Sequence, residues 1–231
     1  MATKKLDQYK GVLSASKIVE GINVAQQNAV RLVEDAELLL ENNRYPSAAS
    51  LAILSIEESG KVSILRGLSV ARDGKDLKES WRDYRSHTKK NVQWIIGDLV
   101  KSGARKLEDF RPIFEKDAEH PLVLDQIKQI GFYTDCLGKK HWSSPENVID
   151  ENLAKMLVGI AKIFASNKVV TEKEIKLWVK HIGPVWKKNM SWMQQSLENW
   201  YREMQESGLA PEGENAMKEF IQGNIDFGQK A

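Results

Sequence analysis

Residues 48–61 form the stretch AASLAILSIEESGK. Its apolar and small residues recur at spacings of three and four, which is the repeat of one face of an α-helix. Pro46, just before the stretch, suits the first turn of that helix. The small residues Ala48, Ala52 and Gly60 allow a neighbouring helix to approach closely. The stretch therefore predicts a helix whose inward face packs against other helices.

Helical periodicity continues on both sides of this stretch. Apolar residues between 18 and 40 follow the same spacing. Further helices are expected over 78–100, 122–135 and 147–167, and strand signals are nearly absent. The sequence thus predicts an all-α fold, a helical bundle formed by residues 14–167.

The remaining residues, 168–231, predict a smaller helical extension. Thr171 and Glu174 have the spacing of a capping box at the start of a helix. Four tryptophans crowd the segment, and such a group more often packs helices together than forms a ligand cage. They are Trp178, Trp186, Trp192 and Trp200. We expect this Trp-rich extension to pack on the bundle or on a partner.

Composition limits the function classes. With 34 basic and 32 acidic residues the net charge is +2, so any RNA site must be a local patch. The single cysteine, Cys136, excludes an intrachain disulfide and fits a reducing compartment. Residues 1–10 lack the apolar core of a signal peptide, and no apolar run approaches the ~20 residues of a membrane span. We expect a cytoplasmic protein without membrane contact.

The first candidate for chemistry is the segment RDYRSH, residues 82–87. Arg82 offers a planar cationic fork that suits phosphate, and His87 can transfer a proton near neutral pH. Five positions on one continuous helix correspond to about 140° of net rotation. The two side chains border one site only if that helix edge faces a groove or a second subunit. The alternative interpretation is a solvated helix face rich in arginine and lysine.

A second candidate is the acidic pair Glu57 and Glu58. Glu57 lies beside the inward face of its helix, and a buried carboxylate needs a partner. Lys61, four residues later, predicts an intrahelical ion pair with Glu57. The functional interpretation is that Glu57 or Glu58 orients Arg82 or His87 across the helix interface.

Three further residues are candidates for supporting roles. Lys90, one helical turn after His87, is placed to neutralise a phosphate oxygen, unless it is simply solvated. Tyr133 and Asp135 offer hydrogen bonds to the same cleft, or else pack at the end of a helix. The histidines at 87, 120, 141 and 181 lack a ligand-like spacing. The sequence therefore predicts neither a metal nor another cofactor.

Three blocks, in order, resemble the AbiV family of bacterial phage-defence (abortive infection) proteins. They are residues 48–61, residues 85–90 with the sequence RSHTKK, and Tyr133-x-Asp135 followed by Trp142 and Pro145. The resemblance covers about residues 20–165. It implies membership of the HEPN superfamily, hence an all-α bundle that dimerises so that two copies of one motif face each other. Many HEPN proteins are metal-independent endoribonucleases that carry Arg-x(4–6)-His, often with a polar residue after the arginine.

The segment Arg82-Asp83-x-x-x-His87 matches that motif. The resemblance thus implies a homodimeric endoribonuclease toxin that cleaves RNA and arrests growth or translation, with Arg82 and His87 catalytic and Asp83 supporting. Implied partners are RNA and a phage-encoded activator or host translation component. Two alternatives stay open: a noncatalytic helical dimer that binds a phage or host protein, and nucleotide binding without cleavage. In the first, Arg82, His87 and Glu57 form a buried polar network.

Overall fold

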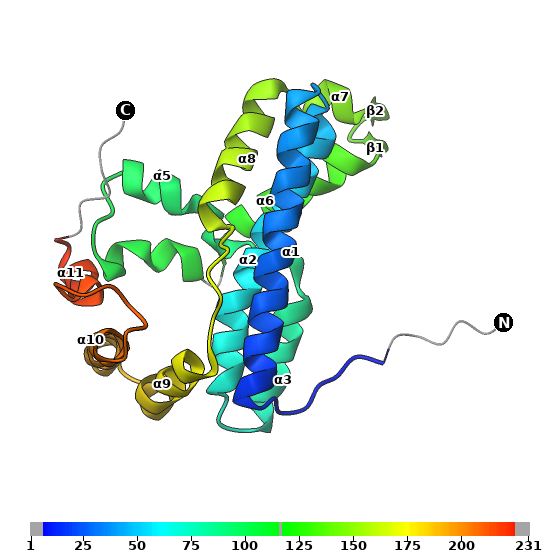
Figure 1. Cartoon of the computed structure of the whole chain (residues 1–231). Coiled ribbons are helices and arrows are strands. Elements are labelled where there is room, and N and C mark those ends of the chain that lie inside the picture. The colour runs from blue at the N-terminus through cyan, green and yellow to red at the C-terminus, as the bar shows by residue number, and fades with distance from the viewer. Residues whose placement is uncertain (1–6, 116, 225–231) are drawn as a thin grey trace.

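The computed structural model describes residues 7–115 and 117–224, and this part of the chain is mainly helical (Figure 1). The elements in chain order are α1 (Ala15–Glu41), α2 (Tyr45–Ser69), α3 (Gly74–Arg85), α4 (His87–Lys90), the 3-10 helix η1 (Val92–Ile95), α5 (Ile96–Lys101), the 3-10 helix η2 (Leu107–Phe114), α6 (His120–Phe132), strands β1 (Asp135–Leu137) and β2 (His141–Ser143), α7 (Pro145–Val148), α8 (Glu151–Phe164), α9 (Glu172–Ile182), the 3-10 helix η3 (Gly183–Val185), α10 (Met190–Glu206) and α11 (Ala216–Gln222). The predicted all-α class is confirmed.

The long helices α1 and α2 form the centre of the molecule. Helix α1 begins where the Ser14 hydroxyl accepts a hydrogen bond from the Lys17 amide. Helix α2 packs against α1, α6 and α8, and the side chains of Ala48, Ala52 and Ile53 are fully buried there.

Within residues 7–115 and 117–224, no helix combines the length and apolarity that a membrane span requires.

The prediction of one helix over 78–100 is wrong, because the chain leaves helical geometry at Ser86 (φ −85°, ψ 126°). Packing explains the break. The backbone of α4 presses against α2 so closely that a Cβ added to Gly60 would lie 1.6 Å from the Lys90 carbonyl oxygen. The buried Asn91 then donates a hydrogen bond to the Pro121 carbonyl oxygen (3.0 Å). His87 therefore starts a separate short helix and does not continue α3.

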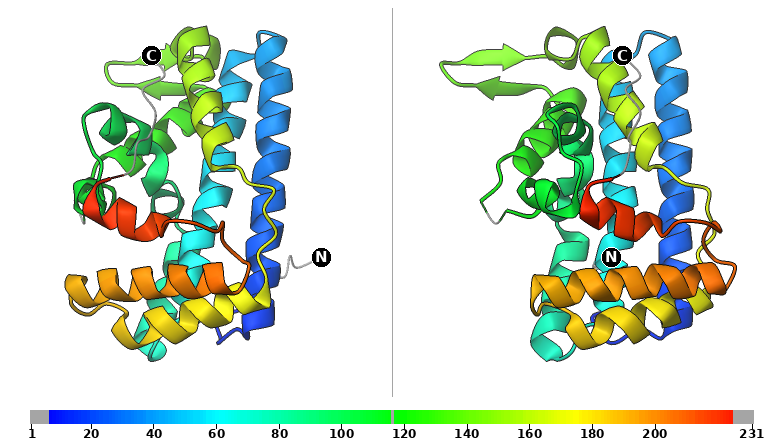
Figure 2. Two further views of the ribbon diagram at one scale, coloured as in Figure 1. Left: turned by 60° about the vertical axis from the view of Figure 1, so that its left-hand side comes forward. Right: turned by 90° about the vertical axis from the view of Figure 1, so that its left-hand side faces the viewer.

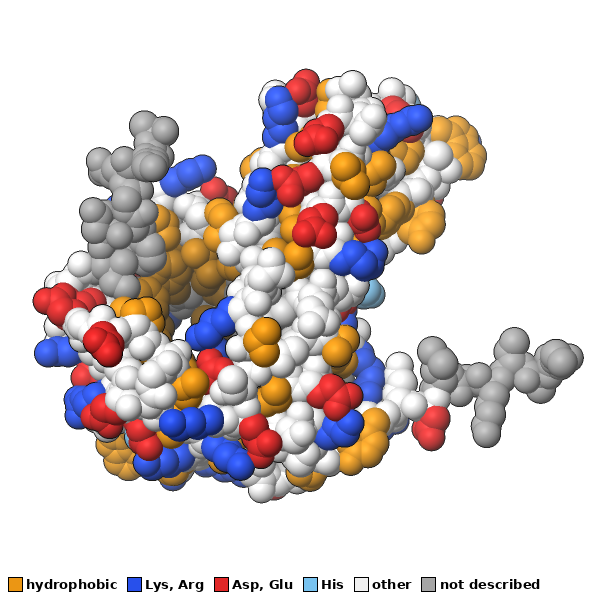
Figure 3. All heavy atoms as spheres, in the orientation of Figure 1, with side chains coloured by type: hydrophobic (Ala, Val, Ile, Leu, Met, Phe, Trp, Pro, Cys, Tyr) orange, Lys and Arg blue, Asp and Glu red, His pale blue; other side chains and the backbone are white. Residues whose placement is uncertain are grey.

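Although strand signals are nearly absent from the sequence, the segment before Pro145 forms an antiparallel hairpin in which Cys136 lies opposite Trp142. The hairpin projects from the helical body, as Figure 2 shows, and hydrophobic side chains gather over it in Figure 3. Helix α6 ends at Phe132. Tyr133 and Asp135 consequently lie at the start of this hairpin and not on the last turn of a helix.

The C-terminal helices α9 and α10 lie across one end of the α1–α2 pair (Figure 2). The predicted capping box is present, since Thr171 and Glu174 each accept a hydrogen bond from the other's backbone amide. Ile175 packs into one apolar cluster with Ile18 of α1, and Trp178 meets Trp200 edge-to-face at 5.3 Å. The extension thus contacts the bundle directly, and its status as a separate unit stays a prediction.

Candidate functional site

The carboxylate of Glu57 is the centre of a charged site between three helices. Glu57 lies on α2 and is 1% exposed. Its Oε2 lies 2.7 Å from Nδ1 of His87 and 3.3 Å from Nζ of Lys90, both on α4. Its Oε1 lies 2.5 Å from Nζ of Lys128 on α6. Lys128 also pairs with Asp125 at 2.7 Å. These five residues are called the Glu57 cluster below.

Two glycines bring α4 and α6 onto α2. Gly60, one turn after Glu57, carries the Lys90 backbone directly against it. Gly131 of α6 faces Ser50 of α2, and a Cβ added there would lie 2.4 Å from the Ser50 Oγ. A larger residue at either glycine would separate the helices. Gly60 in the EESGK block therefore allows α4 to approach α2 closely enough for His87 and Lys90 to contact Glu57.

The Glu57 cluster balances its charges. Glu57 and Asp125 are negative, Lys90 and Lys128 are positive, and the two lysine side chains are only 9% and 5% exposed. Burying a charge costs several kcal/mol unless an opposite charge and hydrogen bonds compensate for the lost water. The four groups meet this condition together, and His87 adds a titratable group at the edge.

The contacts of His87 determine which ring nitrogen carries the proton. Nδ1 lies 2.7 Å from the Glu57 carboxylate and 3.2 Å from the Lys128 ammonium, which cannot accept a hydrogen bond. The shorter contact assigns Nδ1 as the donor to Glu57. In the neutral ring Nε2 then holds the lone pair. The side chain is 54% exposed, so a molecule from solvent can reach it.

The cluster contains a set of donor atoms suited to a cation. One ligand atom each from Glu57, His87 and Asp125 lies within 4.8 Å of the others. The Lys128 ammonium contacts all three groups. The chain's own cation thus occupies the space between the ligands, and a metal ion would have to displace it.

Arg82 does not join the Glu57 cluster. Its side chain is 70% exposed, and its nearest acidic partners are Glu79 at 3.4 Å and Asp83 at 3.7 Å. Of the sequence candidates, the structure brings together Glu57, His87 and Lys90, and leaves Arg82 on α3 outside. The break at Ser86 separates the two halves of the Arg–His motif.

The predicted Glu57–Lys61 ion pair is also wrong. Lys61 pairs with Glu58 at 2.6 Å, and both side chains are mostly buried. The i, i+4 spacing would allow Lys61 to reach Glu57, but His87, Lys90 and Lys128 surround the Glu57 carboxylate instead. Lys61 also lies over the ring of Tyr84, 5.2 Å from its centroid. Glu58 and Lys61 therefore join α2 to α3 next to the site.

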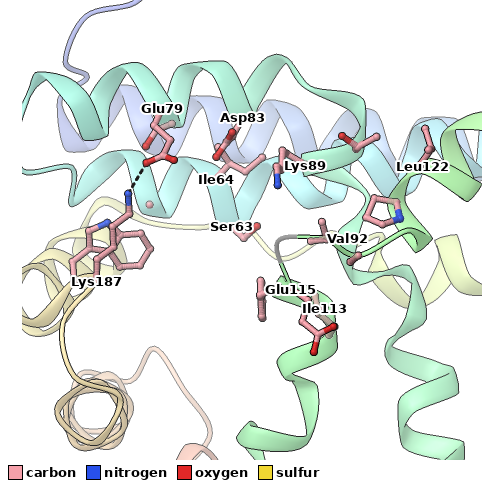
Figure 4. Close-up of a pocket in the computed structure, with 17 residues that line it drawn as sticks. Ser63, Ile64, Glu79, Asp83, Lys89, Val92, Ile113, Glu115, Leu122 and Lys187 are labelled. Atoms are coloured by element: carbon pink, nitrogen blue, oxygen red, sulfur yellow. Dashed lines mark hydrogen bonds and ion pairs between the residues drawn. The ribbon is translucent and has the colours of Figure 1, made fainter.

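Asp83 lines a different cavity. A pocket of about 630 Å³ lies between α2, α3, α4, η2 and the segment after α9. Figure 4 shows Asp83 and Lys89 on its wall, with Lys187 paired to Glu79 at 2.9 Å at one end. No residue of the Glu57 cluster lines this pocket. Asp83 therefore lies beside the site without entering it.

Tyr133 and Asp135 stay outside the cluster as well. Tyr133 is 64% exposed, and Asp135 accepts a hydrogen bond from the neighbouring Cys136 amide (2.7 Å). Within the described residues neither bonds to a member of the Glu57 cluster. The hairpin geometry aims this segment away from the bundle, as Figure 2 shows.

Sequence reasoning missed Lys128 and Asp125. One local signal was present, because Lys128 lies one turn after Leu124 and three residues before Gly131, on the inward face of α6. A lysine on an apolar face needs a buried partner. Nothing local indicates that this partner is Glu57, which lies 71 residues away in the chain.

Comparison with known proteins identifies one family. A family model of the HEPN type, described as AbiV, matches residues 17–166. The match runs from the first turn of α1 to just past the end of α8, so it contains the whole Glu57 cluster and excludes α9 to α11. Comparisons with curated proteins and with solved structures gave no match.

Proposed function

The chain belongs to the AbiV family of HEPN proteins, and we propose that it is a metal-independent endoribonuclease that arrests growth or translation. The family match supports a role in abortive infection, that is, in phage defence. The observation that carries the nuclease proposal is the exposed His87 imidazole held by the buried Glu57 carboxylate at 2.7 Å. A carboxylate that fixes the tautomer of a reachable histidine is typical of proton-transfer sites.

In the proposed reaction, Nε2 of His87 accepts the proton of an RNA 2′-hydroxyl. The 2′-oxygen attacks the adjacent phosphorus, the bond to the 5′-oxygen breaks, and that oxygen takes up a proton. The products are a 2′,3′-cyclic phosphate and a 5′-hydroxyl. Arg82, exposed and only loosely paired, binds the phosphate and stabilises the developing charge. Lys90 points to Glu57, so we assign it a positioning role and not a phosphate contact.

The proposal is tested by incubating purified protein with total cellular RNA in the presence of EDTA. We expect defined fragments with cyclic-phosphate ends, because proton transfer at His87 and charge stabilisation by Arg82 need no metal. The readout is a denaturing gel with end-group analysis. Loss of cleavage in EDTA, restored by a divalent ion, would contradict the metal-independent mechanism. RNA that stays intact with and without EDTA would favour the binding role.

A second candidate function is a noncatalytic dimer that binds a phage or host protein. Two observations favour it: the Glu57 cluster is charge-balanced as a structural network would be, and Arg82 lies apart from His87. In this role the cluster would stabilise the bundle, and His87 would be dispensable for growth arrest. The mutations described in the Discussion separate the two functions.

We also propose that the protein is a homodimer acting in the cytoplasm, as its family implies, with RNA and a phage-encoded activator or host translation component as partners. The small residues of α2 do not provide the dimer surface. Ala48 and Ala52 are fully buried, and Gly60 packs against Lys90 within the same chain.

Because we propose a homodimer, light scattering at micromolar concentration should give about twice the chain mass of 26.2 kDa. HEPN-type catalysis is proposed to need two facing motifs, so the dimer should persist at the concentrations at which RNA is cleaved. A particle of a single chain mass across the active range would contradict this assembly.

A further inference from the structure

Helix α3 carries a row of four cations: Lys75, Lys78, Arg82 and Arg85. Their spacing of three, four and three residues places them within an arc of about 80° and along about 15 Å of helix. All four line one pocket of about 690 Å³, and Lys10 from the segment before α1 lines it as well. Glu79 is the single acidic residue among the ten described residues that line it.

The positive charge of this row is only partly neutralised within the described chain, where Arg82 lies 3.4 Å from Glu79 and 3.7 Å from Asp83. Lys75 and Lys78 are exposed, and no ion pair to an acidic group involves either of them or Arg85 within residues 7–115 and 117–224. Glu79 is already occupied by Lys187 at 2.9 Å, which holds the pKa of the Glu79 carboxyl below its usual value. The row therefore presents a local excess of cations on a chain whose net charge is only +2.

One end of the row is held by contacts within the chain. The Arg85 guanidinium donates hydrogen bonds to the carbonyl oxygens of Trp81 and Tyr9 and lies 5.0 Å from the Trp81 ring centroid. Trp81 is itself buried and bonded to the Gly11 carbonyl oxygen. At the other end, Lys75 and Lys78 are exposed and form no ion pair with the residues that the structure describes. His87 begins α4 two residues after Arg85.

We propose that the row Lys75–Lys78–Arg82–Arg85, with Lys10, binds the backbone of single-stranded RNA and leads it towards His87. A positively charged groove that tracks the backbone is the usual feature of sequence-tolerant binding to single strands. Cations at regular intervals along one helix face match a polymer with regularly spaced phosphates better than an isolated anion. This inference rests on the proposed nuclease function, since it assigns how that site receives its substrate.

The test measures binding of a 2′-O-methyl RNA oligonucleotide, which cannot be cleaved through its 2′-oxygen, by fluorescence anisotropy at several KCl concentrations. Each phosphate contact contributes about 0.7 to the slope of log K against log salt for single strands. The double variant Lys75→Gln/Lys78→Gln should therefore lower the slope by about 1.4. Between 50 and 200 mM KCl, the wild type should lose about sevenfold more affinity than this variant.

Matched controls separate charge from folding. Lys173→Gln/Lys218→Gln removes two exposed lysines that do not line this pocket, and it should leave the slope unchanged. Lys75→Arg/Lys78→Arg keeps the charge and should keep the slope. Lys10 lies outside any helix. The substitution Lys10→Gln should therefore lower the slope by about 0.7 without affecting the stability of α3.

The outcomes distinguish this inference from the nuclease proposal. An unchanged slope in Lys75→Gln/Lys78→Gln, or equally tight binding of polyglutamate of matched charge, would overturn the RNA track; the second result would indicate an acidic protein partner. If Lys75→Gln/Lys78→Gln cleaves natural RNA with unchanged kcat/KM, the nuclease proposal is supported and the proposed RNA track is contradicted. If binding of the oligonucleotide depends on the row but natural RNA is never cleaved, the RNA track is supported and the nuclease proposal is contradicted.

Discussion

The variant His87→Ala should lose RNA cleavage and growth arrest while its helical content and melting temperature stay close to those of the wild type. Removing general acid–base help typically costs ~10²–10⁴-fold in rate. The cost in stability should be small, because the side chain is 54% exposed and Glu57 keeps Lys90 and Lys128 as partners. Cleavage assays, growth curves after induction and circular dichroism provide the three measurements.

The hairpin residue His141 offers a matched control. It is exposed and lies outside the Glu57 cluster, so His141→Ala should retain both cleavage and arrest. Arg82→Ala should resemble His87→Ala, since its exposed side chain contributes charge to the phosphate and little to packing. If His87→Ala unfolds, the structural-network interpretation gains; if it folds and still arrests growth, a binding role is the better account.

The variant Glu57→Gln should be both inactive and less stable. The neutral amide no longer compensates Lys90, whose only acidic partner within the described residues is Glu57, whereas Lys128 keeps Asp125 at 2.7 Å. Breaking a buried pair by removing one partner costs about 3–5 kcal/mol. For a chain of this size, that loss lowers the melting temperature by roughly 6–20 °C. Thermal unfolding followed by circular dichroism measures the change.

Two companion variants show whether stability or positioning explains the loss of activity. Glu58→Gln affects the neighbouring Lys61 pair and should leave cleavage intact, since it does not touch His87. Glu57→Gln/Lys90→Met removes the uncompensated charge as well. This double variant should regain much of the melting temperature but no activity, because His87 still lacks its carboxylate. Wild-type stability in Glu57→Gln alone would show that the cluster does not hold a compensated buried charge.

Local signals in the sequence determined the helices and several of their ends. Ser14 caps α1 and Thr171 caps α9, because a cap depends on a hydroxyl and on amides within three residues of it. The apolar spacing in residues 48–61 determined that α2 is buried on its inward face, and the block carrying Glu57 and Gly60 indicated the family. These properties depend on neighbours along the chain, so the sequence contains them directly.

Which charged side chains meet depends on how distant segments of the chain pack together. Glu57 bonds to His87 and Lys128, which are 30 and 71 residues away, while the local partner Lys61 turns to Glu58. No periodicity encodes such pairings, because they depend on how closely α4 and α6 approach α2 at Gly60 and Gly131.

The same packing overrode local preference around the Arg–His motif. The chain breaks at Ser86, so Arg82 remains on exposed α3 while His87 enters the Glu57 cluster. The local sequence therefore marked Glu57, His87 and Lys90 as candidates, but it pointed neither to Lys128 and Asp125 nor to the helix break before His87. The helix contacts decided which of them lie together, since the close approach of α4 and α6 to α2 at Gly60 and Gly131 brings their charged side chains to Glu57.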